Sequence, residues 1–172
     1  AAGPRRSRPV KSWEELASAL AGREPERAGG DGPRAAVALV LREGAAGGLE
    51  LLFIRRAEHE KDPWSGHMGF PGGRQEPADP DLAATAVRET REETGLDLAA
   101  DGEPLGALDE VKALARGRPV DLVIAPFVHR LRRRLDGAPS HEVVSLHWLP
   151  LERLLSPETR STLQYQYEET LL

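Results

Sequence analysis

The chain has 172 residues, 40% hydrophobic and 30% charged, which is enough for one domain with a single core. Its formal net charge of −5 argues against a general nucleic-acid binder but leaves room for an enzyme of phosphorylated substrates. The absence of cysteine excludes disulfides, a thiolate nucleophile and a zinc–thiolate centre. No apolar run approaches the roughly 18 residues that span a bilayer, so we expect no membrane association and a cytoplasmic location.

The N-terminal part predicts a helix followed by a linker. Ser12 opens a Ser-x-x-Glu capping box, which predicts a short helix through about Leu20. Glycine, proline and charged residues at 22–34 predict a flexible connector. We therefore divide the chain into an N-terminal helix with its connector, 1–34, and a main domain, 35–172.

Three strands are expected at the start of the main domain. Apolar runs at 35–41 and 49–54 flank a glycine-rich turn and predict a hairpin. A polar loop at 55–66 then leads to a short strand at 67–70, directly before a Pro-Gly-Gly sequence. This order places the two glycines immediately after a strand.

The second half predicts three more strands and a short helix. Strands are expected at 103–111 and 120–131, and the second is apolar enough to be central in a sheet. Pro126 would then mark a bulge or a local edge. Alternation predicts a strand at 143–148, and a short helix is expected at 149–155.

Between these halves lies a helix with a dense acidic stripe. Asp79 before Pro80 predicts the N-cap and first helical position, and Gly95 predicts the C-terminal stop. At about 100° per residue, small side chains fall on one side and three carboxylates crowd an adjoining stripe. These carboxylates belong to Glu89, Glu92 and Glu93.

Two interpretations of this stripe compete. Like charges three or four residues apart repel, and Mg²⁺ or Mn²⁺, which prefer oxygen ligands, would relieve that repulsion. Alternatively, Arg88 and Arg91 pair with Glu92 on a solvated helix face. The preceding Gly72-Gly73 pair and the closing Gly-Leu favour the metal site.

Residues 72–96 resemble the Nudix box, G-x5-E-x7-R-E-U-x-E-E-x-G-U with U aliphatic. The match runs from Arg88 onward, except that Thr90 fills the first aliphatic position. The loop before Arg88 is one residue longer, which leaves the roles of Asp79 and Asp81 open. The resemblance implies an α/β/α sandwich with a mixed β-sheet, and a hydrolase of nucleoside diphosphates linked to another group. The predicted order β-β-β-α-β-β-β-α agrees with such an α/β fold.

The resemblance also implies roles for individual residues. The implied metal ligands are the Gly73 carbonyl and the carboxylates of Glu89, Glu92 and Glu93. Arg88 would orient these carboxylates, and the general base would be Glu93 or the more distant Glu142. A surface glutamate at a strand start is an equally weighted alternative for Glu142. The candidate catalytic residues are therefore Arg88, Glu92, Glu93 and Glu142.

The upstream sequence suggests a substrate. An arginine after an apolar strand, then Gly66 ahead of Phe-Pro-Gly-Gly, partly resembles the coenzyme A pyrophosphatase branch, which cleaves coenzyme A to 3′,5′-ADP and phosphopantetheine. The candidate substrate-binding residues are Arg55, Arg56, His67 and Gly72. Residues 130–134, with four arginines, would contact the 3′-phosphate or, as the favoured alternative, form a solvated hairpin tip.

Other functions stay open at this point. The same machinery suits ADP-ribose or another nucleoside diphosphate derivative, and a non-catalytic nucleotide-binding module is a third class. Retention of all three box carboxylates argues against that third class. We expect a small nucleotide-type substrate and no nucleic-acid partner, and we leave open a homodimer. Residues 161–172 end without a capping signal, so the domain is either short or lacks its C-terminal end.

Overall fold

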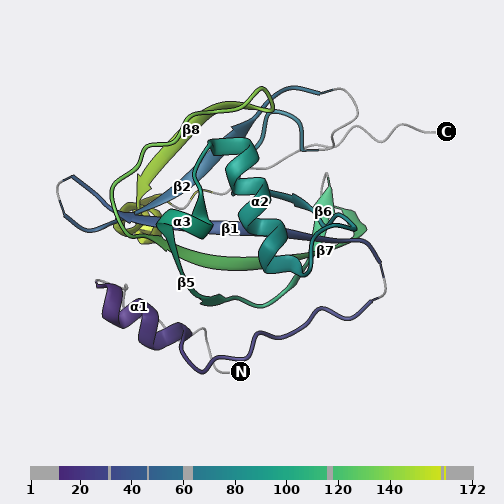
Figure 1. Cartoon of the computed structure of the whole chain (residues 1–172), viewed down its shortest axis with the longest axis horizontal. Helices are drawn as coiled ribbons and strands as arrows, with labels where there is room; N and C mark the ends of the chain where they lie inside the picture. Colours follow the sequence, from purple (N-terminus) through teal and green to yellow (C-terminus); the bar gives the residue numbers. More distant parts are fainter. Residues whose placement is uncertain are drawn as a thin grey trace.

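The structure is a computed structural model that describes residues 12–30, 32–45, 47–59, 64–115, 118–159 and 161. Within these ranges, eight strands form one sheet, with helices on both of its faces (Figure 1). The helices are α1 (Trp13–Leu20), α2 (Leu82–Thr94), α3 (Leu98–Asp101), α4 (Leu151–Leu155) and the 3₁₀ turn η1 (Pro157–Thr159). The strands are β1 (Arg34–Glu43), β2 (Leu49–Arg56), β3 (Met68–Gly69), β4 (Gly72–Arg74), β5 (Gly102–Ala107), β6 (Val111–Ala115), β7 (Arg118–Leu131) and β8 (Val143–Pro150).

The sheet is mixed and is built around β1. β1 and β7 are parallel, in register from Arg34 opposite Val123 to Leu41 opposite Arg130. The remaining pairs are antiparallel: β1 with β2 and β4, β2 with β3 and β8, and β7 with β5 and β6. Because β1 has neighbours on both edges and buried side chains on both faces, it is the centre of the fold.

Apolar side chains of β1 alternate between two cores. Ala38 and Val40 are fully buried with Ala86 of α2 on one face. Leu41 packs on the other face with Leu20 of α1, beside partly buried residues of α4. The expected α/β/α sandwich with a mixed sheet is therefore confirmed, with α2 lying across β1 and α1 beyond β5 (Figure 1).

Most expected elements are present, and their ends shift. The strands predicted at 35–41, 49–54, 120–131 and 143–148 are β1, β2, β7 and β8, each somewhat longer. The expected helix at 149–155 is shorter, because β8 continues through Pro150 before α4 begins. The sequence patterns did not predict the short elements α3 and β4.

The single strand expected at 103–111 was wrong. This segment forms β5 and β6, which pair with successive parts of β7. β5 reaches the partner position Phe127 and β6 starts at Ile124, so the break lies beside Pro126. Because proline has no N–H to donate to a neighbouring strand, this break accommodates it within a central strand.

The N-cap expected for the long helix was also wrong. The side chain of Asp81 accepts a hydrogen bond from the Ala84 N–H at 2.8 Å, and Pro80 lies outside the helix. Asp79 is therefore free for another partner, which is described below. The predicted stop is confirmed, since Gly95 adopts the left-handed conformation with φ of 68°.

The N-terminal segment contacts the main sheet. Ser12 caps α1 by accepting from the Glu15 N–H at 3.2 Å, as the capping box predicts. The connector is hydrogen-bonded to the β5–β6 turn, where the Glu26 N–H donates to Asp109 at 2.8 Å and the Ala28 N–H donates to Glu110 at 3.0 Å. No helix in the described ranges combines the length and the apolar character needed to cross a membrane.

Candidate active site

Two consecutive glycines, Gly72 and Gly73, lie between β1 and α2 and are called the glycine loop below. A Cβ on Gly72, whose φ is 156°, would collide with the carbonyl oxygen of Ala36. A Cβ on Gly73 would collide with the carboxylate of Glu89. The backbone of Gly72 therefore lies directly on β1, and that of Gly73 lies against the carboxylate of Glu89 on the acidic helix.

Glu93 is buried beneath the glycine loop, with 3% of its surface exposed. Its Oε2 accepts a hydrogen bond from the Gly72 N–H at 2.8 Å, and its Oε1 lies 3.4 Å from Nη1 of Arg56. Burial raises the pKa of Glu93 to about 7, even though both of these contacts favour the charged form. Helical spacing alone predicts that Glu92 and Glu93 both point out of the core, and for Glu93 this prediction was wrong.

Glu89 and Glu92 both contact Arg88. Nη1 of Arg88 donates to Oε1 of Glu89 and to Oε2 of Glu92, each at 2.9 Å. Partial burial, opposed by Arg88, raises the pKa of Glu89, and the charges of Glu92 and Glu142 add to that rise. One guanidinium therefore serves several carboxylates and leaves them short of positive charge.

Asp79 fixes Arg88 from the other side. Its two carboxylate oxygens accept from Nε and Nη2 of Arg88, each at 2.9 Å, in a bidentate pair. Oδ2 also accepts from the hydroxyl of buried Thr85 at 3.0 Å and from the Glu76 N–H at 2.9 Å. The pKa of Asp79 is held well below its usual range by Arg88 first and by these hydrogen bonds. The sequence reasoning missed this role because local rules allow either nearby aspartate as the cap.

Thr90 occupies the position where the Nudix pattern has an aliphatic residue. It is fully buried, and its hydroxyl donates to the Ala86 carbonyl one turn earlier at 2.7 Å. A polar side chain is tolerated here because its donor is satisfied within the helix. This departure therefore leaves α2 intact.

Glu142 approaches the same region from the loop before β8. Its side chain is 62% exposed, and its charge raises the pKa of both Glu89 and Glu93. Its backbone carbonyl accepts from the Ala57 N–H at 2.8 Å, next to the end of β2. Glu89, Glu92, Glu93 and Glu142 are called the carboxylate site below.

The two candidate substrate-binding arginines on β2 have different surroundings. Arg56 reaches Glu93, whereas Arg55 is exposed and, as the adjacent residue of a strand, points to the opposite face. His67 is exposed, and its carbonyl accepts from the Arg56 N–H at 3.0 Å. Arg56 and His67 therefore lie beside the carboxylate site, while the side chain of Arg55 does not face it.

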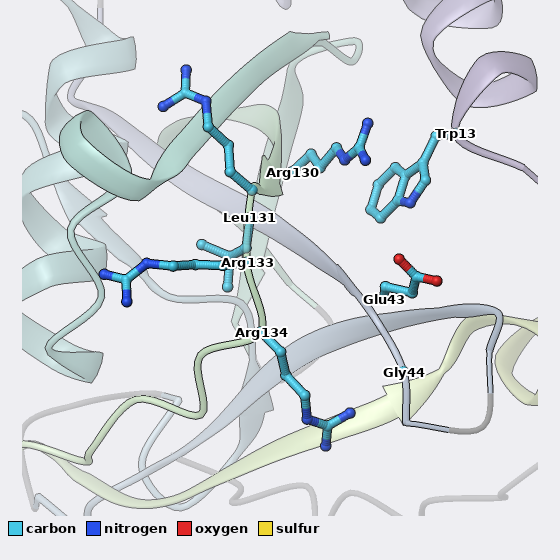
Figure 2. Close-up of a pocket in the computed structure, with 8 residues that line it drawn as sticks. Trp13, Glu43, Gly44, Arg130, Leu131, Arg133 and Arg134 are labelled. Atoms are coloured by element: carbon cyan, nitrogen blue, oxygen red, sulfur yellow. The ribbon is translucent and has the colours of Figure 1, made fainter.

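The arginines of 130–134 lie at the other end of the sheet, beside a pocket of about 240 Å³. Six residues of β1, or about 20 Å, separate this end from the glycine loop. The Arg130 guanidinium stacks 4.5 Å from the Trp13 ring centroid, whereas Arg133 and Arg134 point away from that ring (Figure 2). The pocket is lined by Trp13, Glu43, Gly44 and residues 130–134. This segment is therefore separate from the carboxylate site, and its guanidinium groups do not converge.

The carboxylate site has the charge pattern of a cation site. Burial and the negative charges around Glu89 and Glu93 raise the pKa of these two carboxyls, and Gly73 has no side chain that would displace the Glu89 carboxylate. Among the described residues, no three acidic or imidazole side chains are gathered as a metal-ligand group. The reason is visible in their contacts, since Glu93 is turned to the loop amide and Arg88 holds Glu89 and Glu92. The carboxylate oxygens of this site are suitable ligands for a divalent cation. Arg88 contacts one oxygen of Glu89 and one of Glu92.

A mixed sheet between helices, with an acidic helix packed on a glycine loop, defines the Nudix class of α/β proteins. The family model described as NUDIX domain matches residues 32–169. The chain belongs to the Nudix hydrolase family, as the resemblance of residues 72–96 predicted.

Curated relatives agree with this assignment. An uncharacterized Schizosaccharomyces pombe protein is 35% identical over 70% of this chain and 38% of its own length. The peroxisomal coenzyme A diphosphatase NUDT7 of Mus musculus is 31% identical over 65% of this chain and 45% of its own length. The mitochondrial coenzyme A diphosphatase NUDT8 of Homo sapiens is 42% identical over 37% of this chain and 27% of its own length. The chain thus spans less than half of these relatives.

Solved structures share the fold. A NUDIX hydrolase from Alicyclobacillus acidocaldarius has a TM-score of 0.58 at 22% identity, covering 74% of this chain and 82% of its own. The NUDIX domain of Shewanella oneidensis NrtR, solved with ADP ribose, has a TM-score of 0.57 at 23% identity, covering 81% and 85%. At these identities the likeness concerns the fold alone.

Proposed function

We propose that this chain is a divalent-metal-dependent hydrolase of a nucleoside diphosphate linked to another group, with coenzyme A as its substrate. The products would be 3′,5′-ADP and phosphopantetheine. The observation that carries the proposal is the buried glutamate Glu93, which accepts a hydrogen bond from the glycine loop. Burial raises its pKa to about 7, and other carboxylates of the site add to that rise. Buried carboxyls with shifted pKa values are typical of catalytic sites.

Mg²⁺ or Mn²⁺ is the proposed cofactor. The residues that would hold it are the Gly73 carbonyl, Glu89, Glu92 and Glu93. When bound, the metal lowers the pKa of a coordinated water and neutralises phosphate oxygens. Arg88, held in place by Asp79, keeps Glu89 and Glu92 on the side of the helix that faces the loop.

Two glutamates remain candidates for the general base. A pKa of about 7 places Glu93 between its acid and its carboxylate at neutral pH, which is the range in which proton transfer is efficient. The side chain of Glu142 is 62% exposed, and its charge raises the pKa of Glu93. Arg56 would bind a substrate phosphate, because its guanidinium already lies at the edge of the site.

Coenzyme A is favoured by two lines of support. Curated relatives that share 31% and 42% identity over their matched parts are named coenzyme A diphosphatases. The Gly66-containing motif ahead of the glycine loop resembles that branch as well. A cytoplasmic location, a homodimer and the absence of a nucleic-acid partner stay predictions, and the named relatives are peroxisomal and mitochondrial proteins.

The substrate is tested by incubating the purified chain with Mg²⁺ and a panel of coenzyme A, ADP-ribose, NADH, diadenosine polyphosphates and nucleoside triphosphates. Mass spectrometry of the products should show preferential release of phosphopantetheine. Preferential release of AMP from ADP-ribose or NADH would keep the Nudix chemistry and reject coenzyme A. Glu152→Gln, an exposed change on α4, serves as the matched control and should leave turnover unchanged.

A further inference from the structure

Arg42, near the end of β1, is a buried arginine that contacts the start of the β7–β8 loop, the loop that carries Glu142. Only 3% of its surface is exposed. Its Nε donates to Glu50 at 2.8 Å, and its Nη1 donates to the Leu135 carbonyl at 2.7 Å and to Oδ1 of Asp136 at 2.6 Å. Its guanidinium carbon also lies 3.9 Å from the Trp148 ring centroid. These contacts fasten the start of the β7–β8 loop to β1, β2 and β8.

The loop then runs onto the C-terminal end of α2. The Ala138 N–H donates to the Thr94 carbonyl at 2.8 Å, and the Ser140 N–H donates to the Glu93 carbonyl at 3.0 Å. Gly137 has φ of 76°, and a Cβ there would lie 2.8 Å from the Thr94 carbonyl oxygen. The loop thus satisfies carbonyls that the helix end leaves unpaired, including that of the buried glutamate.

Glu142 follows two residues after this contact. Its N–H donates to the Ser140 hydroxyl at 3.3 Å, and its carbonyl is held by the Ala57 N–H. Among the described residues, the one ion pair of its carboxylate is with His141 at 3.6 Å, where both side chains are exposed. The side chain is therefore placed by the backbone of the loop and not by partners of its own.

We propose that Arg42 and Asp136 are positioning residues that fix Glu142 relative to Glu93 by holding residues 135–142 on the end of α2. The inference rests on the proposed function, because Glu142 needs a position only where the carboxylate site is hydrolytic. A displacement of about 1 Å, caused by a change far from the reacting atoms, lowers turnover by up to roughly 100-fold. Release of Asp136 permits such a displacement, since Glu142 lies only six residues further along the chain.

A second ion pair in the same loop provides a matched control. Arg133 donates to Asp101 at 2.8 Å, at the end of β7, before the loop reaches α2. This pair is of the same chemical type and contacts neither β8 nor the end of α2 in the described structure. Asp101→Ala should therefore leave turnover within about 2-fold.

The test is a double-mutant cycle of Asp136→Ala and Glu142→Gln, measured with Mg²⁺ and coenzyme A. Asp136 is chosen because its side chain is 78% exposed, so its loss should leave the chain folded. Asp136→Ala should lower kcat about 10-fold with KM unchanged, but lower it less than about 2-fold when Glu142 is already glutamine. Asp136→Asn keeps an oxygen acceptor for Arg42 and should restore part of the loss.

Each outcome decides the proposal. An equal loss of kcat in both backgrounds would mean a general structural effect and would overturn it, as would full activity of Glu142→Gln. Either result leaves the proposed hydrolase standing, since the wild type remains active. Inactivity of the wild type on every substrate of the panel would reject the hydrolase and this inference together. Melting temperatures of all variants separate loss of fold from loss of positioning.

Discussion

Arg88 and Arg42 are both surrounded by carboxylates, yet their surroundings differ in charge balance. Arg42 and Arg134 meet Glu50 and Asp136 in a balanced group, and Arg42 lowers the pKa of Asp136. Arg88 is bound to Asp79 and is shared by Glu89 and Glu92, next to Glu93, whose pKa is raised. A balanced arginine cluster is typical of structure, whereas a persistent excess of negative charge indicates a site for a cation or a proton.

The largest effect should come from removing the buried carboxylate of the unbalanced group. Glu93→Gln should lower kcat by about 1,000-fold or more, because the group is expected to bind the metal and to exchange a proton at neutral pH. Steady-state kinetics with Mg²⁺ and coenzyme A measure this loss. Circular dichroism should show a retained fold, and turnover within a few-fold of wild type would remove Glu93 from the proposed mechanism.

In the balanced group, the loss of Arg42 should also lower the stability of the fold. Arg42→Ala would leave Glu50 and Asp136 without their common partner, and it should reduce the free energy of unfolding by about 3–5 kcal/mol. Urea denaturation measures this quantity. The matched change Arg133→Ala breaks an exposed pair and should cost less than about 1 kcal/mol. Equal effects of the two substitutions would contradict the distinction between buried and exposed arginines.

The two groups should also differ in pH dependence without divalent metal. The pKa of Glu93 rises from 4.5 to about 7 on folding, so the native state retains a proton that the unfolded state releases. Stability should therefore fall by about 3 kcal/mol as pH rises from about 4.5 to about 7. Asp79 and Asp136 have lowered pKa values, so their contribution is lost only as pH falls below about 4.

Unfolding midpoints of wild type and Glu93→Gln, measured in EDTA across this range, isolate the Glu93 contribution. The difference between the two proteins should change between pH 4.5 and 7 and be constant above it. A pH-independent difference would show that Glu93 titrates normally in the folded protein.

The smallest effect is expected at Thr90, within α2 but outside both arginine groups. Thr90→Val replaces a satisfied hydroxyl by a methyl group of similar volume, at a position where the family pattern is aliphatic. Stability should change by less than about 1.5 kcal/mol and turnover by less than about 3-fold. A large loss of activity would show that the hydroxyl has a role beyond its hydrogen bond to Ala86.

Local pattern predicted much of this molecule. The central strands and α2 follow from apolar runs and helical spacing, and the acidic stripe of α2 follows from the same spacing. Burial of Glu93 was not predictable, because it depends on the glycine loop that β4 brings over the helix. The role of Asp79 depends on Arg88, nine residues away, and a capping rule cannot rank it above Asp81. Contacts between distant segments decide both cases.

The separation of residues 130–134 from the carboxylate site was likewise not predictable from the sequence. Only the parallel register of β1 and β7 places these arginines at the far end of the sheet. The loop that follows them is hydrogen-bonded to the end of α2, so Glu142 returns to the site although residues 130–134 do not.

Metal binding by Glu93 is tested by a calorimetric titration of the metal-free protein with Mn²⁺ at pH 7, repeated in buffers of different ionisation enthalpy. The wild type should bind and release about half a proton, because Glu93 has a pKa of about 7 and a metal ligand must be deprotonated. Glu93→Gln should bind more weakly and release no proton. Equal affinity and equal proton release in both proteins would contradict the assignment of Glu93 to the metal site.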